Sequence, residues 1–159
     1  NEELVATWGN LVNRVLSMVN KTCEGQVPPS GDRNDEDNKV LSDVDAMLAR
    51  VSKHLEKVEI RAALRAAMDG AAAVNAYLNA TEPWRVAKED LDRAKTILST
   101  ALEAINGVRV ALAPYLPFST ATLEEILGPV SSWQRSQITP GTLIPKPTPL
   151  FAKIEAQND

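Results

Sequence analysis

Apolar residues recur at intervals of three and four along most of the chain, the period of an amphipathic α-helix. From Glu2 to about Cys23 they form one stripe that a single helix face can bury: Leu4, Val5, Trp8, Leu11, Val12, Val15, Leu16 and Val19. Gly25 with Pro28 and Pro29 then ends this predicted helix. Residues 24–38 are polar and turn-rich, and we interpret them as a solvated connection whose acidic run is surface charge.

Four more helices are predicted downstream. The second runs from about Lys39 to Lys57 on a bundle-like seam, and the third covers 60–78, where the alanines at 71–73 permit close packing before Pro83 ends or redirects it. The fourth runs over about 92–113 and a short fifth over about 118–128. Since no strand-like alternation supports a sheet, the predicted fold is all-α, a bundle of about five helices over residues 1–128.

Residues 129–159 have a different character. Pro140, Pro145, Pro147 and Pro149 preclude regular helix, yet the segment is too apolar for a free tail. The apolar positions are Leu143, Ile144, Leu150, Phe151 and Ile154. We expect an extended, Pro-rich C-terminal segment that packs on the bundle or on another part of the protein.

Composition restricts the chemistry. The net charge is −4 over 159 residues, so any nucleic-acid contact must be local rather than a basic coat. Cys23 and His54 are the only cysteine and histidine, which exclude an internal disulfide and a four-ligand zinc site. No apolar run is long enough to span a membrane, and a reducing, cytoplasmic setting is expected. Because helix begins at once after Asn1, without a leader, we expect a piece of a longer polypeptide.

The sequence offers no convincing active site. Its seven glycines are scattered, which excludes a P-loop, and the carboxylate pairs are typical of solvated helix faces. His54 lies in a polar helical context. We therefore predict no catalytic residue and no metal site, and an enzyme in its own right is disfavoured.

Three polar or aromatic residues favour binding instead. Asn10 and Arg14 lie one helical turn apart between apolar positions, so an amide and a guanidinium stand side by side where they can read the edge of a base. Trp84, in the segment 82–88, adds an aromatic ring. From the residues alone, a local hydrogen-bonded pair is the favoured interpretation of Asn10 and Arg14, and a core aromatic that of Trp84.

The ordered motifs nevertheless resemble the C-terminal anticodon-binding domain of class I methionyl-tRNA synthetases, over nearly the whole chain. Gly9-Asn10-Leu11-Val12-Asn13-Arg14 is similar to the first helix of that family, and Asn75-Ala76-Tyr77 with Glu82-Pro83-Trp84 to its Asn-x-Tyr and Pro-Trp element. Pro114-Tyr115-Leu116-Pro117 resembles its Pro-x-x-Pro junction. Gly141-Thr142-Leu143-Ile144 and Pro149-Leu150-Phe151 resemble its terminal segment. Two departures are Ala6, where asparagine is common, and Trp8, where leucine is common.

The resemblance implies that Asn10, Arg14 and Trp84 read the anticodon CAU of methionine tRNA. Trp84 would stack on the first base, a cytosine, while Arg14 donates to its acceptors and Asn10 supplies an amide. Supporting residues would be Asn13, Asn75, Pro83 and Lys88. We expect Asn75 to order the turn before Pro83, and Lys88 to be either a phosphate contact or surface charge. These last four, Asn13, Asn75, Pro83 and Lys88, carry less of the prediction, and Tyr77 and Trp133 are expected to be packing residues.

The resemblance further implies that the ATP and methionine site, with Mg, lies on a catalytic domain upstream of Asn1 in the same polypeptide. The C-terminal segment would return toward that domain, leaving Leu150, Phe151 and Ile154 partly exposed in its absence. Nothing in the sequence supports an oligomer, and this chain would hold no cofactor itself. Two alternatives stay open: a helical protein-interaction module that docks through its Pro-rich segment, and the equivalent domain of a related class I synthetase.

Overall fold

The protein is an all-α bundle in the computed structural model, which describes residues 2–130 and 132–145. Its helices are α1 (Glu2–Thr22), α2 (Asp35–Glu56), α3 (Ile60–Thr81), α4 (Pro83–Val86), α5 (Leu91–Leu112) and α6 (Pro117–Leu127). The predicted fold class and the five longer helices are confirmed. The single-turn α4 was not predicted, since its four residues are too few to show a hydrophobic period.

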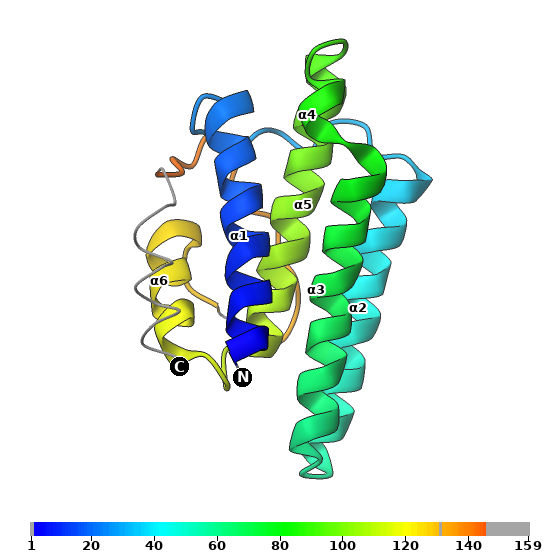
Figure 1. Ribbon diagram of the computed structural model, residues 1–159, viewed down its shortest axis with the longest axis vertical. Helices are drawn as coiled ribbons and strands as arrows, with labels where there is room; N and C mark the ends of the chain where they lie inside the picture. The colour runs from blue at the N-terminus through cyan, green and yellow to red at the C-terminus, as the bar shows by residue number, and fades with distance from the viewer. Residues whose placement is uncertain (1, 131, 146–159) are drawn as a thin grey trace.

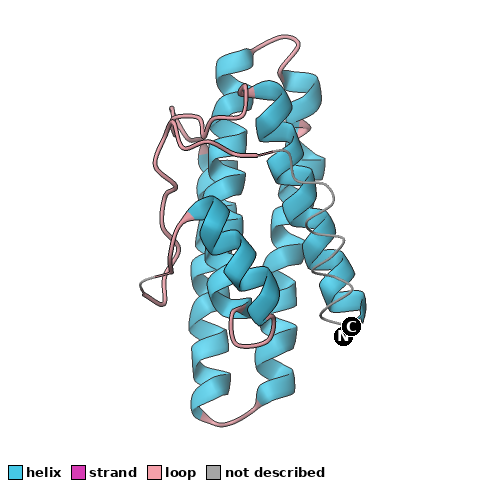
Figure 2. Cartoon of the chain, turned by 90° about the vertical axis from the view of Figure 1, so that its left-hand side faces the viewer, coloured by secondary structure: helices cyan, strands magenta, loops and turns pink. Residues whose placement is uncertain are grey.

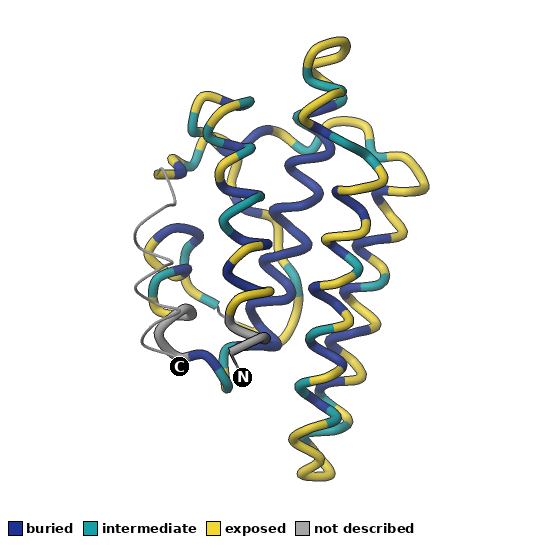
Figure 3. Tube along the Cα trace, viewed as in Figure 1, coloured by how far each residue is buried: buried dark blue, intermediate teal, exposed yellow. Residues whose placement is uncertain are grey.

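The core forms around α5, which runs between α1 and α3 (Figure 1). Almost every residue of α5 from Thr96 onward is buried (Figure 3), including polar ones such as Glu103, Asn106 and Arg109. A helix covered on all sides needs partners for its polar groups. For Glu103 and Asn106 those partners come from two irregular segments, residues 23–34 and 132–145, whereas Arg109 donates to Asn106 within α5.

Helix α2 begins at Asp35, four residues earlier than predicted, and the interpretation of its acidic start as surface charge is wrong for Asp37. The side chain of Asn34 accepts from the backbone N–H of Asp37, while the Asp37 carboxylate accepts from the N–H of Asn34, both at 3.0 Å. This reciprocal capping box starts the helix, and negative charge there suits the helix dipole. Asp37 is fully buried.

The stretch before α2 is also less solvated than predicted, because part of it pairs with the C-terminal segment. The backbone of Val27 donates to Thr142 at 2.9 Å and accepts from Gly141 at 2.8 Å. Ile144 donates to the carbonyl of Gly25 at 2.7 Å. An isolated antiparallel bridge joins the two segments there, so residues 23–34 and 132–145 lie side by side against the helices (Figure 2).

Within the described part of the C-terminal segment, Ile138 and Ile144 are buried and Leu143 is exposed. Trp133, expected to pack in the core, is about two fifths exposed, and its indole N–H donates to the carbonyl of Leu48 at 2.9 Å. The predicted exposure of Leu150, Phe151 and Ile154 falls on residues outside those that the structure describes.

Candidate nucleic-acid interface

An open groove of about 530 Å³ lies between α1 and α3. Its lining residues are Thr7, Asn10, Leu11, Arg14, Ala71, Ala72, Asn75, Ala76 and Asn79. The alanines of α3 leave the space, because larger side chains there would fill it. The lining thus combines small apolar residues with three amides and a single cation, which suits the flat apolar face and polar edge of a base better than a phosphate backbone.

Arg14 is fixed from three directions. Its Nη1 donates to Oδ1 of Asn75 and its Nη2 to Oδ1 of Asn79, each at 2.8 Å. The guanidinium carbon also lies 5.1 Å from the centre of the Trp84 ring, which is within cation–π range. Arg14 therefore bridges α1, α3 and α4, and the open alternative of a local pair with Asn10 does not describe its contacts.

The backbone between α3 and α4 places Trp84 at this point. Glu82 adopts the left-handed conformation at φ 48° and ψ 60°, which costs a residue with a side chain about 1 kcal/mol. Pro83, which is buried, follows at the first position of α4, where its missing N–H and fixed φ suit a helix start. An ion pair of 2.6 Å between Arg85 and Glu82 closes the turn. Trp84 remains 43% exposed, so it is not a core aromatic.

The other predicted residues lie in different places. Asn10 is exposed and lines the groove beside Arg14. Asn13 is turned about 100° away from Arg14 around α1 and does not line the groove; its Oδ1 is buried without a hydrogen bond in the described part of the chain. Lys88 is exposed in the turn after α4. Asn75 holds Arg14 instead of ordering the turn before Pro83.

Asn79 was missed by the sequence reasoning. It follows Asn75 by four residues, the same spacing that drew attention to Asn10 and Arg14, and both asparagines are exposed amides on one face of α3. This spacing is the one signal in the sequence that points to Asn79. It does not reveal the partner of Asn79, because Arg14 is 65 residues away in the sequence.

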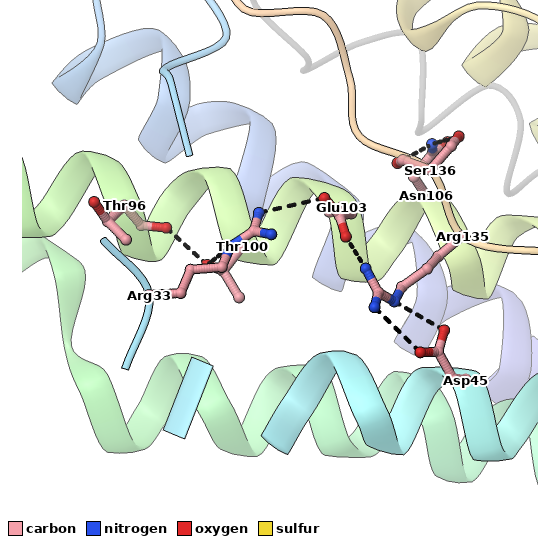
Figure 4. Close-up of polar contacts among 8 residues, drawn as sticks. All are labelled: Arg33, Asp45, Thr96, Thr100, Glu103, Asn106, Arg135 and Ser136. Atoms are coloured by element: carbon pink, nitrogen blue, oxygen red, sulfur yellow. Dashed lines mark hydrogen bonds and ion pairs between the residues drawn. The ribbon is translucent and has the colours of Figure 1, made fainter. Parts of the chain in front are cut away.

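A second polar cluster holds the two irregular segments, residues 23–34 and 132–145, against α5 and α2 (Figure 4). Glu103 accepts from Arg33 at 3.3 Å and also from Arg135, which makes two further bonds to Asp45 at 2.8 and 3.1 Å. The amide of Asn106 donates to the backbone oxygen of Ser136 at 2.8 Å. Since these groups satisfy one another, the cluster explains the packing of the segments and leaves little capacity for a ligand.

A third cluster joins α2, α3 and α5. Asp37 receives two bonds from Arg93, at 2.6 and 2.9 Å, and one from the hydroxyl of Tyr77 at 2.5 Å. Burial would raise the pKa of the Asp37 carboxyl, but the bonds from Arg93 and Tyr77 outweigh it and hold that pKa below its usual value. Tyr77 is a packing residue as expected, and burial together with Asp37 raises its pKa. The cluster is a structural link between helices.

The described residues include no nucleophile poised for chemistry. Burial raises the pKa of the Cys23 thiol to about 11, so it stays protonated at neutral pH. His54 lies on the surface and contacts Glu59 at 3.0 Å. Among residues 2–130 and 132–145 no group of three His, Cys, Asp or Glu side chains is placed to hold a metal ion. The described helices also include none that is long and apolar enough to cross a membrane.

Comparison with known proteins gives this geometry a context. A family profile described as the anticodon binding domain of methionyl tRNA ligase matches residues 27–159. A methionine–tRNA ligase of Roseiflexus castenholzii is 35% identical over an alignment of 186 residues, covering 98% of this chain and 31% of that protein. The corresponding ligase of Bacteroides fragilis is 38% identical over 161 residues, covering 98% of this chain and 24% of the relative.

Solved structures agree with the sequence relatives. The free form of methionyl-tRNA synthetase from Mycobacterium tuberculosis superposes with a TM-score of 0.83 at 30% identity, over 94% of this chain and 32% of that one. The form bound by methionyl-adenylate gives a TM-score of 0.81 over 91% and 30%. The chain thus spans about a third or less of the length of the proteins it matches.

Proposed function

Because this chain belongs to the family of anticodon-binding domains of methionyl-tRNA ligases, we propose that the groove between α1 and α3 reads the anticodon of methionine tRNA. The observation that carries the proposal is Arg14, held by Asn75 and Asn79 beside the exposed ring of Trp84. A cation with two fixed hydrogen bonds keeps three of its five N–H donors for a ligand. It is therefore oriented before the ligand arrives.

The bases of a single-stranded loop can be splayed out, stacked on aromatic rings and read along their edges. In the proposed complex the first base of the anticodon CAU, a cytosine, stacks on Trp84. Arg14 donates to the carbonyl oxygen and ring nitrogen of the base, and Asn10 supplies the complementary amide. Stacking contributes about 1–3 kcal/mol of affinity to any base, whereas a bidentate contact discriminates between bases by a similar amount. The edge contact therefore separates anticodons by roughly 1–3 kcal/mol, or about 5-fold to 160-fold.

For the longer protein we propose the activity that its relatives' names state, the attachment of methionine to tRNA. We further propose that it acts in the cytoplasm. ATP, Mg and methionine would bind on a catalytic domain of the same polypeptide, whereas this chain supplies the tRNA contact. Within the chain we propose a helical binding unit at 1–128 and, at 129–159, an extended C-terminal segment that packs on the bundle or on the catalytic region. The described residues 132–145 support this division, since they lie along the bundle and contact it at Leu48, Asp45 and Asn20.

The full-length protein tests the proposal through two activities measured side by side. We expect Trp84→Ala and Arg14→Ala to lower kcat/KM for tRNA charging by at least tenfold, because each removes one of the contacts above. Methionine-dependent pyrophosphate exchange, which needs no tRNA, should stay near the wild-type rate. Trp133→Ala is the matched control, since this tryptophan is similarly exposed at 39% but belongs to the C-terminal segment.

Equal loss of both activities would mean that the substitutions act on folding or on catalysis rather than on tRNA. Unchanged tRNA charging in Trp84→Ala would favour the competing view, a helical module that binds protein. A loss in Trp133→Ala as large as that in Trp84→Ala would also remove the assignment of the groove as the reading site.

A further inference from the structure

The hairpin between α2 and α3 projects beyond the rest of the bundle, and its tip is exposed (Figures 1 and 3). Residues 50–65, which form the tip, contain five Lys or Arg and two Glu, a net charge of +3 in a chain whose overall charge is −4. One of the two acids, Glu59, already pairs with His54 at 3.0 Å. The tip is therefore a local basic surface on an acidic domain, and the groove residues do not account for it.

Two of these cations lie on the same face of α3 as the groove. Arg61 and Arg65 precede Asn75 and Asn79 by fourteen residues each, which is close to four whole helical turns. Both arginines are exposed. Asp69, one turn from Arg65, sits to one side of this line. One stripe of α3 thus carries the clamp for Arg14 at one end and two arginines at the other.

We propose that Arg61 and Arg65 bind backbone phosphates of the duplex stem that continues from the anticodon loop, an inference that rests on the proposed function of the groove. At 1.5 Å per residue, Arg65 lies about 15 Å and Arg61 about 21 Å from Asn75 along α3. These distances span several base pairs of an A-form RNA duplex, whose rise per pair is somewhat less than the roughly 3.4 Å of B-form DNA. A loop held in the groove would place its stem along this stripe.

Charge complementarity favours phosphate as the ligand. Arginine forms paired hydrogen bonds with phosphate oxygens, and such contacts orient a nucleic acid without reading its sequence. The two ends of the stripe would then have different roles in binding. The groove reads the bases, and the arginines fix the direction in which the stem leaves.

The test measures binding of the full-length protein to an anticodon stem-loop RNA over a range of salt concentrations. Each phosphate contact contributes roughly 0.7 to 0.9 to the slope of log K against log salt. We expect the double variant R61Q/R65Q to reduce that slope by about 1.5 and to weaken binding at low salt by about tenfold. The ratio of affinities for the CAU loop and for a loop with a changed first base should be unchanged. Shortening the stem to about two base pairs should abolish the difference from wild type.

Two comparison variants separate the possible failures. R50Q/K53Q removes the same charge from the α2 side of the tip, and an equal loss of slope there would overturn the assignment to the α3 stripe. Trp84→Ala reports on the groove. If it abolishes anticodon preference while R61Q/R65Q changes neither slope nor affinity, the stripe faces something else, such as an acidic protein surface, and this inference fails alone. If neither variant affects RNA binding, the proposed function itself fails.

Discussion

The clamp on Arg14 makes a prediction that separates positioning from direct contact. Asn75 and Asn79 each accept one 2.8 Å hydrogen bond from the guanidinium, and both are exposed. Hydrogen bonds to a charged group contribute about 1.5–3 kcal/mol, and exposure to water brings these two below that range, to roughly 1 kcal/mol each. The double variant N75A/N79A leaves Arg14 tethered only by its contact with Trp84.

The expected cost in tRNA binding follows from the freedom that Arg14 regains. Immobilising a long side chain on binding costs about 0.5–1.5 kcal/mol. In the wild type this cost does not arise on binding, because the asparagines already immobilise Arg14 in the free protein. We therefore expect N75A/N79A to weaken tRNA binding and to lower kcat/KM for charging by about 2-fold to 13-fold. The loss should be smaller than that of Arg14→Ala, which also removes the contact with the base.

The decisive measurement is a double-mutant cycle on the full-length protein, with tRNA affinity determined in all four combinations. If the asparagines act only through Arg14, adding N75A/N79A to Arg14→Ala should cost almost nothing more. An additional loss as large as that in the wild-type background would show that Asn75 and Asn79 contact the RNA themselves, which would refute the positioning argument. Pyrophosphate exchange provides the control for folding, because it does not require the groove.

Two predictions concern stability, measured by urea unfolding of the chain. Asp37→Asn should destabilise the fold at pH 7 by about 2 kcal/mol, because it removes the buried charge facing Arg93. Since the folded-state pKa of Asp37 is lowered, the wild type should lose this contribution to the free energy of unfolding as the pH falls below about 4. The free energy of unfolding of the variant should change less over the same pH range, and an equal dependence on pH in both proteins would contradict this. Gly107→Ala should cost about 1–3 kcal/mol despite the better helix propensity of alanine, because its Cβ would lie 2.5 Å from a methyl of Val44 and 2.9 Å from Cβ of Arg135; a stabilised variant would contradict that packing.

Hydrophobic period was sufficient for the helices because burial of one face is a local property of the sequence. It placed the five longer helices and failed at the start of α2. There the capping pair is Asn34 and Asp37, with aspartate where the usual signature has glutamate or glutamine. The charged residues around this pair are typical of a solvent-exposed segment. That Asp37 is buried depends on Arg93, 56 residues away, and on Tyr77, 40 residues away. Local composition carries no record of such partners.

The candidate site shows the same division. Helical spacing put Asn10 and Arg14 on one face, and the resemblance added Trp84. Neither indicated that Asn79 completes the set, because the rotation of α1 relative to α3 about their axes is decided by packing between the helices, through buried residues such as Leu11 and Ala71. Asn13 illustrates the converse, since it lies in the same motif as Asn10 and Arg14 and is turned away from the groove.

The net negative charge of the domain is consistent with its proposed binding of RNA, because a few of its cations lie where RNA would contact them. A basic coat would bind any RNA, because phosphate attraction is independent of sequence, and it would add affinity without discrimination. This chain instead has one cation in the groove, which Asn75 and Asn79 orient, and a local net charge of +3 at the tip of the α2–α3 hairpin. The acidic remainder repels nucleic acid that does not fit both places. Specificity here would come from the few places that carry positive charge, so adding lysines to the exposed face of α6 should raise affinity for all RNAs and reduce the preference for one.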